Sequence, residues 1–243
     1  EGLGLSYLEL SVVAEELGRA LAPIPFSSSV YLATEAILAA GSEEQKQAYL
    51  PGLAAGTSIG CFALGESAGQ ASPASLTTKA DGASITGVKI PVADGDVANF
   101  AIVVATSDKG DGASLYIVDL DQGGVSRESI TTIDPSRSHA KLTLNAAGAQ
   151  LLGNEGEGWS HVQSILNRAA VLFAWEQVGG CDTALNMAKE YALGRFAFGR
   201  PIATYQAIKH KLANIYVKNT LARSNCYYGA WAISTDADEL PIA

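Results

Sequence analysis

The sequence predicts an α+β fold of more than one domain, with N-terminal helices, a central antiparallel β-barrel or sandwich and a C-terminal bundle of long helices. The main observation is a change of hydrophobic period along the 243 residues, from helical to alternating at Ser58 and back to helical after Leu152. A second observation is the clustering of Gly and Asp between short apolar runs in the middle third. We therefore expect three domains, at residues 1–57, 58–152 and 153–243.

The N-terminal domain is predicted to consist of three successive helices. Leu3 to Ala22 repeats apolar residues on one stripe, and the prolines that follow stop the pattern. Ser29 to Ala40 is a second, more apolar helix pattern. Ser42 is a good N-cap for a third helix, because Gln45 stands at the capping-box position, and this helix is expected to extend to about Ala55.

The middle domain is predicted to be a sheet of mainly antiparallel strands. Its runs are rich in β-branched and aromatic residues or alternate between apolar and polar positions. The predicted strands are Ala83 to Val92, Phe100 to Thr106, Ser114 to Asp119 and Lys141 to Leu144.

The C-terminal domain is predicted to contain two long helices, Trp159 to Phe196 and Thr204 to Ser234. Gly179 and Gly180 would weaken the middle of an exposed helix, so we expect them where another helix packs closely. Both helices are too long to cover a small core alone. We therefore expect a helix bundle that is shared between subunits.

Composition and charge exclude several classes of function. Hydrophobic residues make up 48% and charged residues 17%, which is typical of a well-buried globular protein. The net charge of -9, with no basic run, argues against nucleic acid as a partner. No apolar run approaches the roughly 20 residues of a membrane helix, so we expect no membrane span.

Cysteine and histidine usage indicates reduced thiols and no metal site. The three cysteines are far apart and odd in number, and the three histidines show no ligand spacing. No signal peptide is visible. The sequence begins inside a helix pattern, however, so it does not exclude a segment before Glu1. We expect a cytoplasmic protein.

The segment from Tyr191 to Ala213 joins the two long helices by a tight corner. This corner collects two cations, Arg195 and Arg200, with the aromatic Phe198 and the amide of Gln206. Such a set suits a planar ligand that carries phosphate. The alternative is a helix corner with solvated arginines, which the residue chemistry alone favours.

The residue pattern of this segment resembles that of the acyl-CoA dehydrogenase family. Members of that family carry Y-A-x-x-R-x-x-F-G-x-x-(I/L)-x-x-x-Q-A-I-x-x-x-L-A here. The residues in register are Tyr191, Arg195, Phe198, Gly199, Ile202, Gln206, Ala207, Ile208, Leu212 and Ala213. The resemblance implies that Arg195 and Gln206 reach across a subunit interface to the FAD of a neighbouring protomer.

The resemblance covers nearly the whole chain, including the loop Leu152 to Trp159, and it implies the family's fold and reaction. The reaction is α,β-dehydrogenation of an acyl-CoA thioester by a flavoprotein of lipid and fatty acid metabolism, with hydride transfer to FAD. The implied partners are acyl-CoA, electron-transfer flavoprotein and further subunits, in a homo- or hetero-oligomer such as a dimer of dimers. Family members are usually longer at both ends, so we expect a chain truncated at both ends.

The flavin pocket of the middle domain departs from the family's pattern. The family's T-E-P-x-A-G-S-D segment matches residues 65–72, where Glu66 is kept, and its W-I-T-N or W-I-S-N segment matches residues 91–94. The changed positions are Gly65, Gln70, Ala71, Pro91 and Ala93. Each lost side-chain hydrogen bond to the flavin would cost about 1 kcal/mol, so flavin binding is expected to be weakened. Backbone donors at Leu64, Gly65 and Ala93 remain candidates for the cofactor.

The catalytic base is not identified in the sequence. One family position for the base lies beyond Ala243, and the other matches Ala169, which has no carboxylate. Glu176 is a weak alternative base, and a buried or interfacial ion pair is the better interpretation of it. Arg168 is a candidate for holding the CoA chain, because the family's arginine there matches Ala170.

Three hypotheses follow. The chain could be a subunit of a heteromeric enzyme that supports FAD across an interface, or an ordinary homotetrameric enzyme with an eroded pocket. It could also be a non-catalytic scaffold or CoA-thioester-binding homologue. In the first case this chain alone would be inactive.

Overall fold

The computed structural model describes residues 4–107 and 112–243, so the predicted helix start at Leu3 lies outside the described residues. These residues form two compact units, which are described separately. The sheet unit comprises Pro23–Ala169, and the helical unit combines the N-terminal helix with Ala170–Ala243. The predicted domain boundaries at residues 57 and 152 stay predictions.

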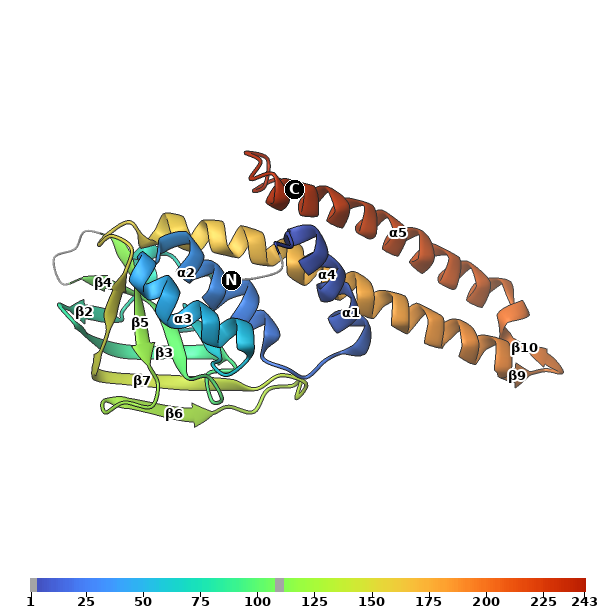
Figure 1. Ribbon diagram of the computed structural model, residues 1–243. Helices are drawn as coiled ribbons and strands as arrows, with labels where there is room; N and C mark the ends of the chain where they lie inside the picture. Colours follow the sequence, from blue (N-terminus) through green and yellow to red (C-terminus); the bar gives the residue numbers. More distant parts are fainter. Residues whose placement is uncertain (1–3, 108–111) are drawn as a thin grey trace. The chain divides into compact units, whose positions relative to one another are not determined.

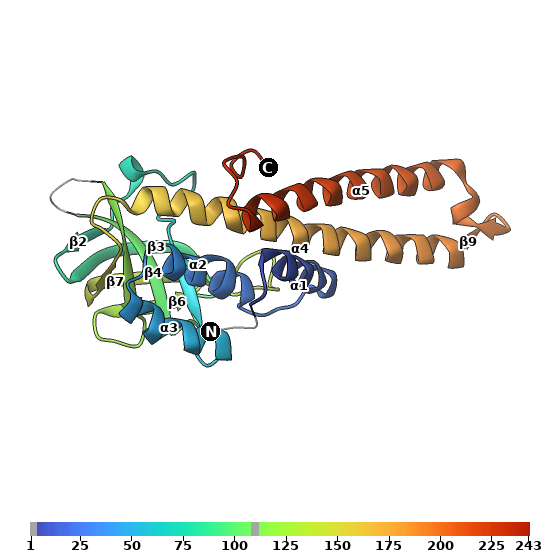
Figure 2. The same cartoon turned by 45° about the horizontal axis from the view of Figure 1, so that its top comes forward.

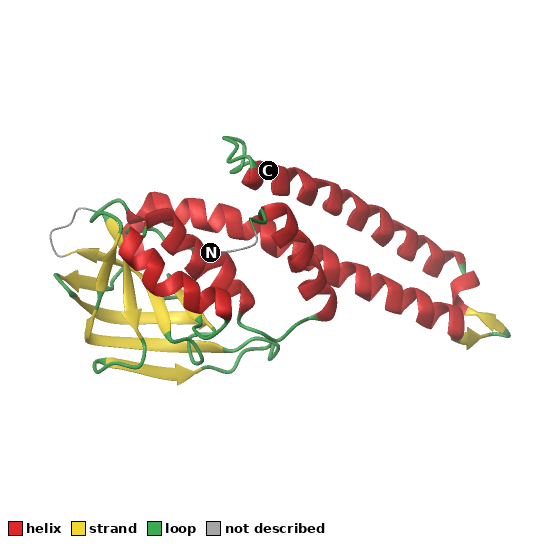
Figure 3. Ribbon diagram, viewed as in Figure 1, coloured by secondary structure: helices red, strands yellow, loops and turns green. Residues whose placement is uncertain are grey.

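The sheet unit contains one eight-stranded, mostly antiparallel sheet (Figures 1 and 3). Its order is β6-β7-β3-β2-β4-β5-β8, with β1 also paired to β4, and only the β1–β4 and β2–β4 pairs are parallel. The strands are β1 (Gly60–Ala63), β2 (Lys79–Asp81), β3 (Ser84–Ala93), β4 (Phe100–Ser107), β5 (Ala113–Asp119), β6 (Val125–Ser129), β7 (His139–Gly148) and β8 (Gln150–Leu152). The four predicted strands are confirmed, and the short strands β1, β2, β6 and β8 were missed.

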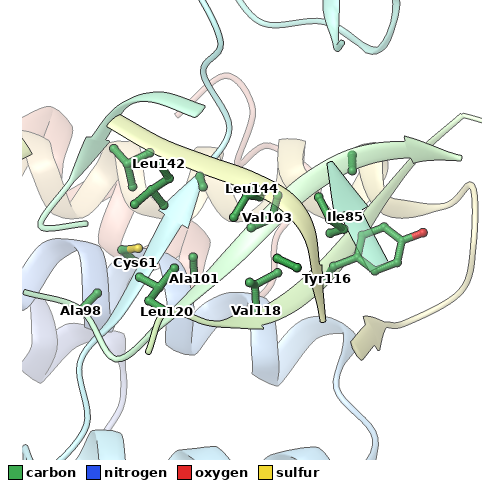
Figure 4. Packing of buried hydrophobic residues seen from close by; sticks show 14 of the residues in the cluster. Cys61, Ile85, Ala98, Ala101, Val103, Tyr116, Val118, Leu120, Leu142 and Leu144 are labelled. Atoms are coloured by element: carbon green, nitrogen blue, oxygen red, sulfur yellow. The ribbon is translucent and has the colours of Figure 1, made fainter. Parts of the chain in front are cut away.

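Strand β4 is buried along nearly all of its length because it carries a core on each face. One face joins a cluster enclosed by the sheet, in which residues of β3 and β7 meet those of β4 and β5 (Figure 4). This cluster includes Cys61, Ile85, Ala101, Val103, Val118 and Leu142. The alternate residues of β4 face a second cluster, which the helices cover. It includes Ile37, Phe100, Ile102, Val104, Val162 and Ile165.

The helices of the sheet unit begin close to the predicted positions. They are the π-helical segment η1 (Ser27–Thr34), α2 (Glu35–Ala40), α3 (Glu43–Ala55), a short 3₁₀ turn η2 (Pro73–Ser75) and the first part of α4 (Gly158–Gly194). The predicted capping box of α3 is confirmed, since Ser42 Oγ accepts from Gln45 N and Gln45 Oε1 accepts from Ser42 N. Pro51 lies inside α3 without ending it.

The helical unit contains α1 (Tyr7–Ala20), the rest of α4, the two-stranded ribbon of β9 (Phe196–Ala197) and β10 (Arg200–Pro201), the 3₁₀ turn η3 (Ile202–Thr204), and α5 (Gln206–Ser234). Contacts between α4 and α5 show that they are antiparallel, as the ribbon drawing also shows (Figure 2). The Trp175 and Tyr227 rings pack edge to face at 4.9 Å, and Asn219 Nδ2 donates to Asp182 Oδ1 over 3.1 Å.

Helix α1 crosses α4 so closely that only glycine fits at the contact. A Cβ added at Gly18 would lie 1.9 Å from the Glu176 carbonyl oxygen, and one added at Gly179 would lie 2.0 Å from the Glu15 carbonyl oxygen. This confirms the expectation of close packing at Gly179.

Three large apolar residues of the predicted stripe of α1 lie outside this contact. Leu8, Val12 and Val13 are 45–63% exposed, whereas Ala14 and Gly18 are buried. The physical reason is the small distance between the helix axes, because larger side chains on the contact face would hold the two backbones apart.

A closed ring of charges ties the three helices of this unit together. Arg19 binds Glu15 (2.5 Å) and Asp182 (3.0 Å), and Arg223 binds the same two carboxylates at the same distances. Such a network holds its side chains in one geometry more firmly than an isolated surface pair.

Candidate functional site

The corner between α4 and α5 is a two-residue β-hairpin. Arg200 pairs with Ala197 and Pro201 with Phe196, which leaves Phe198 and Gly199 as the turn. Both turn residues have left-handed φ, 53° at Phe198 and 78° at Gly199. This is the backbone that a two-residue hairpin requires, and glycine adopts it without strain whereas phenylalanine does not.

The predicted cofactor residues Arg195, Phe198 and Gln206 come together at this corner, in the helical unit. Arg195 directly follows α4, Phe198 occupies the turn and Gln206 is the first residue of α5. All three are exposed, and the Phe198 side chain reaches 96% exposure. An exposed guanidinium, aromatic ring and amide in one corner fit a ligand with phosphate groups and a planar ring.

Tyr205 joins this hairpin to the start of α5. Its hydroxyl donates to the Ala197 carbonyl oxygen over 2.8 Å. The Arg200 guanidinium lies over its ring, 4.2 Å from the centroid. Its own carbonyl oxygen accepts from the amides of Ile208 and Lys209 in the first turn of α5.

The predicted residues Leu64, Gly65 and Ala93 lie in the sheet unit. Gly65 and Ala93 are half-buried and carry no side-chain donor. The carbonyl oxygen of Gly65 accepts from Ile90 N over 2.8 Å, and a Cβ at Gly65 would stand only 3.2 Å from the Ile90 carbonyl oxygen. Neither Gly65 nor Ala93 therefore offers a side-chain hydrogen bond to a ligand.

A buried ion pair lies directly behind the Leu64–Gly65 segment. Lys89 Nζ is 2.7 Å from Glu66 Oε1 and donates to the Leu64 carbonyl oxygen over 3.2 Å, with the two side chains 0% and 8% exposed. Glu66 also accepts from the amides of Thr77 and Thr78. We call this arrangement the Glu66 clamp, because it binds three separate segments.

Burial and hydrogen bonding act in opposite directions on the acidity of the Glu66 clamp. Burial would raise the pKa of Glu66, but the hydrogen bonds from Lys89, Thr77 and Thr78 outweigh it and hold the pKa at about 2. Burial also lowers the pKa of Lys89, and Glu66 opposes that shift.

The clamp predicts a loss of stability in acid. The pKa of Glu66 is about 2 in the folded protein and 4.5 for an ordinary glutamate, so its contribution to stability is complete above pH 4.5 and declines as the pH falls toward 2. It amounts to roughly 3 kcal/mol at neutral pH. Urea unfolding at pH 7 and pH 3 should show that Glu66→Gln is much less sensitive to acid than the wild type. Equal sensitivity of the two proteins would contradict the clamp.

Helix α4 carries the remaining predicted residues. Ala169, which matches a family position of the base, is buried, and Arg168 beside it is half-buried in the sheet unit. Glu176 is half-buried in the helical unit. The roles of Arg168 and Glu176 stay predictions.

Within residues 4–107 and 112–243, no three His, Cys, Asp or Glu side chains are arranged to hold a metal ion. No described helix combines the length and the apolar character that crossing a membrane requires.

The sequence analysis did not identify Lys89 or Tyr205 as site residues. Only for Lys89 does the residue pattern contain information that could have done so. Side chains alternate between the two faces of a strand, so Lys89 lies on the same face of β3 as the apolar Ile85. A lysine on this inward face needs a partner of opposite charge, and Glu66 could have been predicted as that partner. For Tyr205 the contacts depend on the path of the turn, which no residue pattern specifies.

Comparisons with known proteins agree on one family. Residues 1–57 match the family described as acyl-CoA dehydrogenase, N-terminal domain, and residues 156–243 match acyl-CoA dehydrogenase, C-terminal domain. An acyl-CoA dehydrogenase of Bacillus subtilis is 32% identical over 243 residues, covering 94% of this chain and 64% of the relative. The human mitochondrial short-chain specific acyl-CoA dehydrogenase is 33% identical over 239 residues, covering 91% and 57%.

Solved structures show the same fold. Butyryl-CoA dehydrogenase from Megasphaera elsdenii superposes with a TM-score of 0.91 at 26% identity, covering 98% of this chain and 66% of that chain. The Tcur3481-Tcur3483 steroid ACAD gives a TM-score of 0.84 at 31% identity, covering 98% and 64%. A structure of the electron transferring flavoprotein of Acidaminococcus fermentans gives a TM-score of 0.92 at 28% identity, covering 98% and 67%. The chain thus spans about two thirds or less of the length of these proteins.

Proposed function

Because the chain belongs to the acyl-CoA dehydrogenase family, we propose that it is a subunit of an FAD-dependent acyl-CoA dehydrogenase and contributes its hairpin to the flavin site of a neighbouring subunit. The observation that carries this proposal is the contrast between two parts of the chain. The hairpin presents Arg195, Phe198 and Gln206 to solvent, whereas Gly65 and Ala93 offer no side-chain donor.

Each hairpin residue has a role that its chemistry supports. Arg195 would donate charge-assisted hydrogen bonds to the pyrophosphate of FAD. Gln206 would add a neutral amide donor, and Phe198 would present a ring face to a planar group. When bound, FAD accepts the hydride from the β-carbon of the acyl group.

The complete flavin pocket would then come from a homologous partner subunit, and so would a base at the position that Ala169 occupies here. Ala169 supports this division, since it is a buried residue without a carboxylate at a family position of the base. The substrate would be an acyl-CoA, and electron-transfer flavoprotein would accept the electrons. The similarity to the Acidaminococcus structure supports that acceptor.

The same observations favour a second candidate function, a non-catalytic scaffold or CoA-thioester-binding homologue. Gly65, Ala93 and Ala169 together would suit a protein that has lost the reaction. This candidate differs from the first in one respect, because it requires no flavin contact at the hairpin.

Replacing Arg195 with alanine tests the proposal. In the complete assembled protein, Arg195→Ala is expected to weaken FAD affinity by roughly 10- to 100-fold, as the loss of a charge-assisted hydrogen bond should. Fluorescence titration of the apoprotein with FAD measures this, and Lys218→Ala, an exposed lysine on α5, is the matched control. FAD binding that is equal in Arg195→Ala and the wild type would favour the scaffold.

A further inference from the structure

We propose that Tyr205, together with Arg200, is a positioning residue that holds the Phe198 turn in the conformation that meets FAD. This inference rests on the proposed function, since it explains how the hairpin acts there. The two side chains are called the Tyr205 brace below.

The turn needs such support because its backbone is strained and its ribbon is short. Phe198 has a φ of 53°, which is uncommon for a residue with a bulky side chain and costs conformational energy. The ribbon that flanks it pairs only two residues on each side. A two-stranded ribbon of this length is not stable by itself.

The Tyr205 brace contacts both sides of the turn. On one side, the Tyr205 hydroxyl binds the carbonyl oxygen of Ala197, the residue before Phe198. On the other side, the Arg200 guanidinium stacks on the Tyr205 ring, directly after Gly199. Below the turn, the amide of Ile202 donates to the Arg195 carbonyl oxygen over 2.8 Å.

The base of the brace is rigid because Tyr205 is the N-cap residue of α5. Its amide closes the 3₁₀ turn onto the Ile202 carbonyl oxygen over 3.1 Å, and its carbonyl oxygen accepts from Ile208 and Lys209. The long helix therefore fixes the position of the tyrosine ring, and the ring fixes the turn.

Burial of apolar side chains does not explain why the Phe198 turn is held in this conformation. Phe196 is 62% exposed and Phe198 is 96% exposed, so the ordered turn buries little apolar surface of its own. Strain that is maintained at an exposed aromatic side chain points instead to presentation of that side chain to another molecule.

The test compares three variants in the complete assembled protein. Tyr205→Phe removes only the hydroxyl, Tyr205→Leu also removes the ring under Arg200, and Tyr216→Phe is a control at an exposed tyrosine of the same helix. FAD affinity is expected to fall about fivefold in Tyr205→Phe, the effect of one neutral hydrogen bond, and by tens of fold in Tyr205→Leu. The control should bind FAD as the wild type does.

Amide hydrogen exchange gives a readout that does not depend on FAD. Amides of residues 196–200 should exchange faster in both Tyr205 variants, while the thermal midpoint of the protein stays close to that of the wild type. A merely structural role would instead lower the midpoint and leave affinity unchanged in the fraction that remains folded.

The outcomes separate the brace from the function on which it rests. If Arg195→Ala weakens FAD binding and neither Tyr205 variant does, the brace is overturned and the proposed function stands. If Arg195→Ala and both Tyr205 variants all bind FAD as the wild type does, both are overturned. Weakened binding with faster exchange at residues 196–200 supports the brace.

Discussion

Gly179→Ala is expected to destabilise the helical unit by about 3 kcal/mol or more, the range of severe overpacking. The added methyl group would lie 2.0 Å from the Glu15 carbonyl oxygen and 2.9 Å from the Arg19 amide nitrogen. Both are backbone atoms, so no rotamer change relieves the clash and the two helices must move apart. Urea unfolding monitored by circular dichroism measures the loss.

Gly194 provides a matched control for this prediction. It is the last residue of the same helix, and a Cβ added there would meet no atom within 4 Å. Gly194→Ala should therefore be neutral or stabilise the protein by up to about 1 kcal/mol, through the lower backbone entropy of alanine. Equal stability of the two variants would show that α1 does not cross α4 at Gly179.

Lys89→Met is expected to destabilise the sheet unit by roughly 3–5 kcal/mol. Methionine has nearly the volume of lysine, so the main effect is electrostatic: the variant leaves the Glu66 carboxylate, only 8% exposed, without its cation. Lys79→Met, at an exposed position of the neighbouring strand β2, is the control and should change stability little.

The double variant Lys89→Met, Glu66→Gln separates charge from packing. Because it removes both charges, it should recover a large part of the lost stability, as replacement of buried pairs often does. If the double variant is as unstable as the sum of the two single variants, the two residues do not interact and the clamp is refuted.

The fold was largely predictable because local patterns and packing agree in most of the chain. The apolar run from Phe100 identifies β4, and the Ser42–Gln45 capping box marks the start of α3. The predicted helix from Ser29 to Ala40 is instead a π-helical segment, Ser27–Thr34, followed by α2. π-helical segments are rare, and the apolar pattern of so short a run did not distinguish one from an α-helix.

The candidate site was predictable only where it is carried by a continuous segment. Arg195, Phe198 and Gln206 stand within twelve residues of one another, and the structure gathers them at one corner. The Glu66 clamp joins three distant segments through strand register, and the Tyr205 brace depends on a turn geometry that phenylalanine disfavours. Such contacts are decided by tertiary packing, which overrides local preference.

We propose that this chain supports a neighbour's flavin and is poorly equipped to hold its own. The visible absorption spectrum of the full-length protein, purified alone and after co-expression with a homologous partner subunit, tests it most directly. We expect no flavin band from the chain alone, a flavin band from the complex, and a weaker band when the complex carries Arg195→Ala. Stoichiometric flavin bound to the chain purified alone would contradict it.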